Sequence, residues 1–145
     1  MDDKTMKQMA IMVNAVQPHC DEEIFAALTC AHAGSISSVL ISKLMSGAGT
    51  IVKSSKLPNP VFLAVGSKTI YAFKYAPRGF KFKIKKEVAR WPKDEVSVTV
   101  EKTKTIATFV MTTDSGEHFP LEVSIMFGGE PLADLFFTAI GASQD

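Results

Sequence analysis

The chain has 145 residues, of which 46% are hydrophobic and 21% are charged, and its formal net charge is +1 at pH 7. This length is typical of one domain that buries a core without disulfides or structural metal. The near-zero charge excludes a global attraction to nucleic acid, so a charged partner would have to be bound by a local patch. Two cysteines are too few for a disulfide framework, and residues 1–20 lack a basic stretch followed by an apolar run, so we expect a cytoplasmic protein.

The first elements predicted along the chain are a helix and a strand. Residues 1–18 carry apolar side chains at the spacing of one helical face, and Pro18 is expected to end the helix. These apolar side chains are Met6, Met9, Ala10, Val13 and Val16. Residues 24–33 then alternate between two faces that are both mostly apolar, which predicts a strand buried on both sides.

A long segment, residues 34–59, follows the first strand and exceeds the usual length of a hairpin loop. Its apolar residues predict one face of a short helix at about residues 36–45. The residues of this face are Ile36, Val39, Leu40 and Leu44. Together with the N-terminal helix, they are our candidate surface for a protein partner or for a homo-oligomer. Lys43 interrupts the longest weakly polar run, so we expect no transmembrane segment.

Six further strands and one helix are expected after residue 60, because turn signals or prolines bound each apolar run. The strands are predicted at residues 61–65, 69–75, 87–91, 96–101, 106–113 and 119–125. Pro77 and Pro92 are expected to interrupt strand pairing because they lack an N–H donor. An apolar stripe after Gly128 and Gly129 predicts a C-terminal helix at about residues 130–141. We therefore predict a mainly β fold in a single domain, residues 1–145: a seven-stranded antiparallel barrel or bent sandwich capped by a C-terminal α-helix, with an extra N-terminal helix.

Several of these stretches resemble bacterial pleckstrin-homology-like proteins of the actinobacterial type, whose function is uncharacterised. The resemblance is carried by the strand, turn and strand of residues 61–73, and by residues 87–91, 96–98, 114–116 and 121–123. It covers residues 22–140 and includes the long insertion after the first strand, but no catalytic motif. The resemblance implies a seven-stranded fold with one capping helix. It also implies a binding module for acidic membranes, phosphoinositides or protein segments, without enzyme activity or a cofactor.

The densest charge feature runs from Lys74 to Lys93 and holds eight basic residues against one acid, Glu87. Its central part, residues 78–90, is the candidate basic segment. Apolar and basic residues alternate strictly from Phe80 to Lys85, so an extended backbone would place lysines on one side and apolar side chains on the other. We hypothesise that this segment contacts an anionic membrane surface or an acidic ligand. The candidate residues are Arg78, Lys81, Lys83, Lys85 and Lys86. The same pattern is typical of a solvated edge strand that resists aggregation, and inward-pointing Phe rings argue against nucleic acid as the partner.

Cys30 and His32 are the remaining pair of residues that could form a metal-binding or catalytic site. They would share a strand face, and His19 and Cys20 precede them, so together they resemble a set of metal ligands. However, adjacent His19 and Cys20 would point apart, and Cys30 on an apolar face fits a small core residue. No third group is evident that would orient Cys30 and His32 as a nucleophile pair. We therefore expect no metal site and no catalytic residues.

Overall fold

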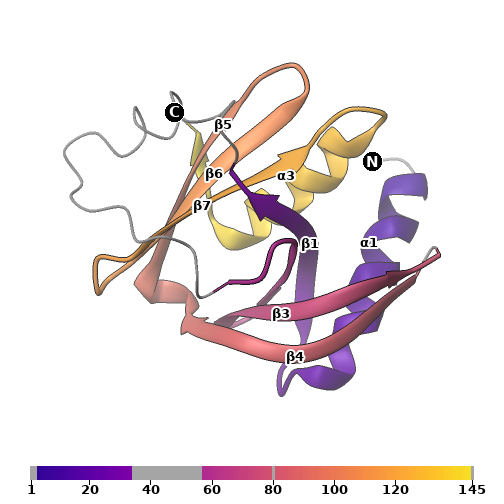
Figure 1. Cartoon of the computed structure of the whole chain (residues 1–145), viewed down its shortest axis with the longest axis horizontal. Coiled ribbons are helices and arrows are strands. Elements are labelled where there is room, and N and C mark those ends of the chain that lie inside the picture. Colours follow the sequence, from indigo (N-terminus) through magenta and orange to yellow (C-terminus); the bar gives the residue numbers. More distant parts are fainter. Residues whose placement is uncertain (1–2, 34–56, 80, 145) are drawn as a thin grey trace.

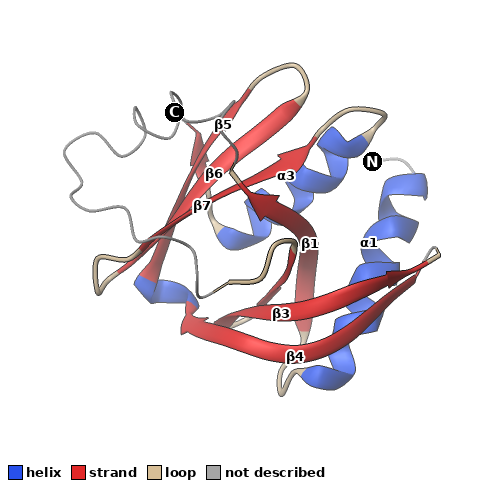
Figure 2. Ribbon diagram, in the orientation of Figure 1, coloured by secondary structure: helices blue, strands red, loops and turns tan. Residues whose placement is uncertain are grey.

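The computed structural model describes residues 3–33, 57–79 and 81–144. Within these ranges the chain forms helices packed on a sheet (Figures 1 and 2). In chain order the elements are α1 (Asp3–Val16), η1 (Gln17–His19), β1 (Ile24–His32), β2 (Val61–Gly66), β3 (Thr69–Arg78), β4 (Lys81–Pro92), η4 (Lys93–Glu95), β5 (Val96–Lys102), β6 (Ile106–Thr113), β7 (His118–Ser124), α3 (Gly129–Ile140) and β8 (Ser143–Gln144). The short helix predicted at residues 36–45 lies outside the described residues.

The sheet has the strand order β4-β3-β2-β1-β7-β6-β5-β8. Strands β1 to β7 pair in antiparallel fashion, and the two-residue β8 adds to β5 in parallel. β1 connects the two parts of the sheet, because its first residues pair with β2 whereas Ala31 and His32 pair with β7. In Figure 1 the β3 and β4 strands accordingly run across the lower part of the molecule, with β5, β6 and β7 above them.

The core lies between these two parts of the sheet. Trp91 at the end of β4 contacts Phe119 of β7, with ring centroids 5.5 Å apart, and Phe119 is fully buried. α3 packs on β1, β2 and β7, and its Phe137 contacts Phe109 of β6 at 5.2 Å. The fold class predicted from the sequence is thus confirmed: a mainly β chain with a seven-stranded antiparallel sheet, an N-terminal helix and a C-terminal helix, consistent with a pleckstrin-homology-like barrel or sandwich.

α1 covers the outer side of β1 and β4 and also contacts α3. Its buried residues are Thr5, Met9, Met12 and Val16. The predicted apolar face was wrong in part, since Met6 is 53% exposed and Ala10 is exposed. The helix instead presents the stripe that begins at Thr5, and this orientation places Met9 against β1. The Met9 sulfur accepts a hydrogen bond from the Ala27 N–H at 3.3 Å.

β4 is much longer than the strand predicted at residues 87–91, and β3 runs through Pro77 to Arg78. The expectation that Pro77 interrupts pairing was therefore wrong. β2 pairs with β3 only from Ile70 to Phe73, so no strand lies beside Pro77 on the side away from β4. Arg78 and Lys81 form the last pair of the hairpin, so the backbone position before Arg78 would direct its N–H away from β4, toward the edge of β3 where no strand lies. Pro77 at this position therefore costs no hydrogen bond of the sheet.

Candidate functional site

The end of the β3–β4 hairpin projects beyond its neighbouring strand. β3 and β4 pair from Thr69 to Arg78, whereas β2 accompanies β3 only as far as Phe73. Residues 74–78 and 81–86 therefore form a two-stranded unit, which we call the hairpin extension (Figure 2). A two-stranded hairpin has little stability of its own, so this one must be supported through one of its faces.

Aromatic contacts provide that support on the face turned toward α1. Tyr75 and Phe82 both contact Phe62 of β2, each with ring centroids 5.6 Å from it, and they lie 5.9 Å from each other. Ile84, which pairs with Tyr75, is only 7% exposed. Burial raises the pKa of Tyr75, and a hydrogen bond with Thr29 of β1 partly opposes this shift. The hairpin extension is thus fixed to the body of the protein on one side.

Cations occupy the opposite face of the hairpin extension. On β3, Lys74 and Arg78 continue the face that carries buried Ile70 and Ala72 nearer the core. On β4, the residues that pair on this face are Lys81 with Arg78, Lys83 with Ala76 and Lys86 with Lys74. We call Lys74, Arg78, Lys81, Lys83 and Lys86 the basic face. All five are exposed, and the face changes from apolar to basic where β2 ends beside β3.

A bulge adds a sixth cation to this surface. The register of β4 shifts between the residues opposite Lys74 and Tyr75, which leaves Lys85 without a direct partner on β3. Such an extra residue breaks the strict alternation of a strand. Lys85 and Lys86 are consequently both exposed, although they are neighbours in sequence.

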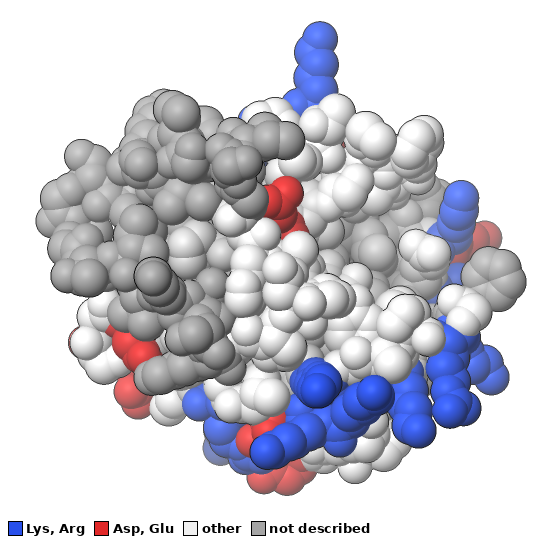
Figure 3. All heavy atoms as spheres, viewed as in Figure 1, with Lys and Arg blue, Asp and Glu red and all other residues white. Residues whose placement is uncertain are grey.

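No acid neutralises these six cations within the described part of the chain. The ion pairs found there involve Arg90 and Lys102, and none involves the basic face or Lys85. Figure 3 shows lysine and arginine side chains gathered along the lower and lower right edge of the molecule, where β3 and β4 run in Figure 1. The five residues predicted from the sequence, Arg78, Lys81, Lys83, Lys85 and Lys86, therefore lie together, and Lys74 joins them.

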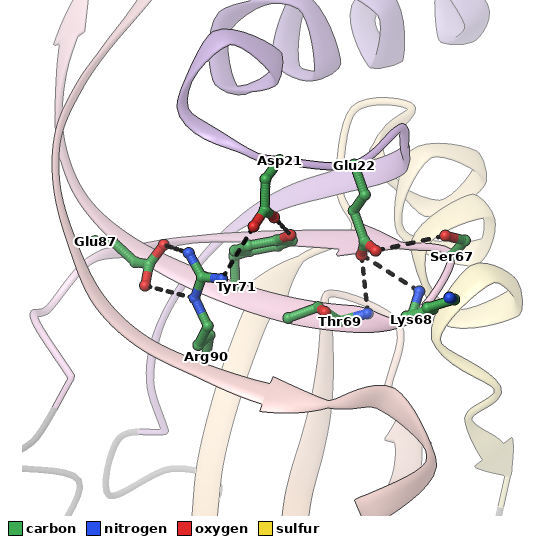
Figure 4. A network of polar contacts seen from close by, with 8 residues as sticks. All are labelled: Asp21, Glu22, Ser67, Lys68, Thr69, Tyr71, Glu87 and Arg90. Carbon is green, nitrogen blue, oxygen red and sulfur yellow. Dashed lines mark hydrogen bonds and ion pairs between the residues drawn. The ribbon is translucent and has the colours of Figure 1, made fainter.

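Arg90, at the end of the predicted basic segment, belongs to a different cluster (Figure 4). Its guanidinium donates to both carboxylate oxygens of Glu87, at 2.7 and 2.8 Å, lies 3.6 Å from the Asp21 carboxylate and stacks over the Tyr71 ring. The Tyr71 hydroxyl donates to Asp21 at 2.7 Å. This bond lowers the pKa of Asp21, whereas burial first and the same bond second raise the pKa of Tyr71 to about 12.

Glu22, which follows Asp21 in the sequence, binds the turn between β2 and β3. One carboxylate oxygen accepts hydrogen bonds from the backbone N–H groups of Thr69 at 2.9 Å and Lys68 at 3.3 Å (Figure 4). A Cβ atom at Gly66 would collide with this carboxylate, so a larger residue there would displace the Glu22 side chain from these hydrogen bonds. Asp21 and Glu22 thus tie the segment after α1 to β3 and β4, which is a structural role rather than a binding site.

The other predicted site residues have ordinary structural surroundings. Cys30 is buried, and burial raises its pKa far above the usual range for a thiol. His32 donates from Nε2 to the Leu57 carbonyl oxygen at 3.0 Å, and its backbone N–H donates to Asn59 at 3.1 Å. No group of three or more His, Cys, Asp or Glu side chains is placed to hold a metal in the described ranges. The expected lack of a metal or catalytic site stays a prediction.

The interaction surface predicted at residues 36–45 cannot be placed, because Ile36, Val39, Leu40 and Leu44 lie outside the described residues. The apolar face of α1, the other part of that prediction, is used within the chain. Across the described elements, no helix is long and apolar enough to cross a membrane. No protein-family model matches the chain, and no curated protein matches it either.

Proposed function

We propose that this protein is a non-enzymatic, pleckstrin-homology-like binding module that associates peripherally with anionic membrane surfaces. The observation that supports this proposal is the basic face of the hairpin extension, with Lys85 beside it. Six exposed cations lie close together there, and no described acid pairs with them. Such a surface is suited to a partner that carries many negative charges in one plane.

The expected binding is weak and salt-dependent. Each Lys or Arg close to an anionic membrane contributes about 1 kcal/mol, and residues 74–78 of β3 span roughly 13 Å along the strand. Alternate residues on one strand face lie about 7 Å apart, which is within the Debye length of about 8–10 Å at physiological ionic strength, so neighbouring cations act on the same patch of lipid. A reversible contact that weakens as salt is added follows from these magnitudes.

Other cations of the chain provide a contrast. Arg90 is held by Glu87 and Asp21, and Lys102 donates to Glu130 and Asp134. Lysines along an edge strand also resist aggregation, and β4 is the last strand of the sheet. Protection of an edge strand requires some charge but does not require six cations without acidic partners on one surface. This excess of positive charge is the feature that favours an anionic partner.

Nucleic acid is a poorer fit to this surface than a membrane. Single strands are bound by basic grooves combined with exposed aromatic rings on which bases stack. On the described hairpin extension, Tyr75 and Phe82 turn to the side opposite the basic face and contact Phe62. Trp91 packs against Phe119. The basic face therefore offers charge without a described stacking platform.

Vesicle sedimentation with a charge-reversed pair tests the proposal. Lys81→Glu with Lys83→Glu removes two attractions and adds two repulsions, a change of about 4 kcal/mol or roughly a thousandfold in partition. The matched control, Lys68→Glu with Lys104→Glu, makes the same change in net charge at exposed residues away from the hairpin extension. Binding to vesicles containing phosphatidylserine should be lost only in the first variant.

Three results would overturn the proposal. The first is wild-type protein that stays in the supernatant with anionic vesicles at low salt. The second is equal loss of binding in both double variants, which would indicate a response to net charge. The third is retention by a single-stranded RNA of mixed sequence without retention by vesicles, which would assign the basic face to nucleic acid. Protein spun without vesicles controls for aggregation.

A further inference from the structure

A second unusual surface lies in the turn between β7 and α3. Phe127 is 94% exposed and Met126 is 42% exposed, although both side chains are apolar. Phe127 also has a φ of 55°, which a bulky residue rarely adopts. The turn is held by a hydrogen bond from the Gly129 N–H to the Met126 carbonyl oxygen at 3.1 Å. The backbone is thus constrained in a shape that keeps an aromatic ring in solvent.

A lysine of α1 flanks this apolar turn. A hollow of about 360 Å³ separates the turn from the first turns of α1 and is lined by Lys4, Gln8, Met126 and Phe127. Lys4 and Lys7 are exposed, and Asp3 is the only acidic residue of α1. Lys4 therefore places a positive charge beside the apolar side chains of the turn.

The same side of α1 connects the turn to the hairpin extension. A hollow of about 440 Å³ follows the helix from Gln8 to Ile11 and reaches Gly79 and Phe82 at the end of the hairpin. Ile11 is 41% exposed there, and Lys81 lines the next hollow beside it. Figure 1 shows the turn before α3, the N-terminal end of α1 and the end of the β3–β4 hairpin along the right edge of the molecule.

We propose that Met126 and Phe127 insert into the anionic membrane as an apolar anchor beside Lys4 of α1, with the end of the hairpin, which carries Lys81, along the same edge of the molecule. This inference rests on the proposed function and adds a second contact to it. Surfaces that lie in a membrane interface combine apolar side chains with flanking lysines, and two weak signals together give stable attachment. Aromatic rings suit the boundary between head groups and acyl chains.

Removal of the anchor should weaken binding without removing its dependence on charge. Phe127→Ser is expected to lower partition into phosphatidylserine vesicles by roughly tenfold or more, because burial of one Phe side chain is lost. The salt dependence of the remaining binding should stay as in the wild type. Phe25→Ser is the matched control. Phe25 is 53% exposed near the start of β1, a strand that begins in the lower part of the molecule in Figure 1, and its loss should change partition less than twofold.

A fluorescent variant reports insertion directly. Phe127→Trp should show a blue-shifted emission with phosphatidylserine vesicles and quenching by brominated acyl chains. Wild-type protein is the control, because its only tryptophan, Trp91, is partly buried against Phe119 and should not respond. A shift that follows the fraction of bound protein would support the anchor.

The outcomes separate this inference from the proposed function. If the wild type binds anionic vesicles in a salt-sensitive way, but Phe127→Ser binds equally well and the emission of Phe127→Trp does not shift, the anchor is refuted and the basic face stands. If the wild type does not bind at all, both fail. If light scattering shows a dimer that Phe127→Ser dissociates, the partner of this turn is a second copy of the chain and the anchor is refuted.

Discussion

Phe82→Ala tests the idea that aromatic contacts hold the hairpin extension in place. Full loss of a buried Phe side chain costs about 3–5 kcal/mol, and Phe82 is only partly buried, so we expect about 2 kcal/mol. The variant also loses the contacts of this ring with Phe62 and Tyr75. For a chain of 145 residues this corresponds to a decrease in melting temperature of roughly 6–8 °C.

Calorimetry combined with hydrogen exchange measures both the size and the location of this effect. Amides of residues 74–76, 78 and 81–86 should lose protection, whereas those of β6 should change only with global stability. Phe127→Ala is the control, because a side chain that is 94% exposed should change stability by less than about 0.5 kcal/mol. A melting temperature within a degree of the wild type for Phe82→Ala, or uniform loss of protection throughout the sheet, would refute the reasoning.

Four further predictions concern the body of the protein. Burial, followed by the charge of Glu87, raises the pKa of Cys20 from 9.0 to about 11, so iodoacetamide should label this thiol slowly at neutral pH and faster as the pH approaches 11. Cys30 is buried and should react only in denaturant. Rapid labelling of either thiol at pH 7 would contradict the structure. The raised pKa of Cys20 also means that its contribution to stability is present below pH 9 and is lost as the pH rises toward 11, which a comparison with Cys20→Ser by chemical denaturation will show. Glu22→Ala should destabilise the protein by about 1–2 kcal/mol in the same assay, whereas no change would mean that the hydrogen bonds of the β2–β3 turn are dispensable. Met12→Ala should cost about 2–5 kcal/mol because Met12 is 4% exposed, and a smaller loss would indicate that α1 is weakly docked.

The elements that could be predicted from the sequence are those whose signals are local. The strands expected at residues 61–65, 96–101 and 106–113 match β2, β5 and β6 within about a residue, because side-chain alternation and turn residues both mark their ends. The C-terminal helix was predicted correctly for a similar reason. Its apolar stripe is continuous, and Gly141 ends it with a φ of 77°.

The features that could not be predicted depend on what lies beside a residue in space. Pro77 is tolerated in β3 only because β2 has already ended, and the sequence does not show that. The bond between Asp21 and Tyr71 joins residues 50 positions apart. The orientation of α1 was set by the sheet against which it packs, so Met6 is exposed where helical periodicity predicted a buried side chain.

In the candidate site, too, features with a local sequence signal could be predicted, whereas features that depend on spatial neighbours could not. Alternation from Phe80 to Lys85 was sufficient to expect the lysines on one side of a strand. Lys74 belongs to the same charge-rich stretch but is not among the predicted contact residues, although its alternation with Ala76 and Arg78 was an available signal. Phe127 carried no signal, since only the structure distinguishes an exposed Phe from a core Phe.

Sedimentation of the wild-type protein with vesicles tests the central claim most directly. Vesicles of phosphatidylcholine alone and vesicles that also contain phosphatidylserine should be compared at about 0.01 M and about 1 M salt, where the Debye length is about 30 Å and 3 Å. We predict that the protein pellets only with the anionic vesicles and only at low salt. Equal binding to both lipid compositions, or binding that persists at high salt, would contradict a contact made by the basic face.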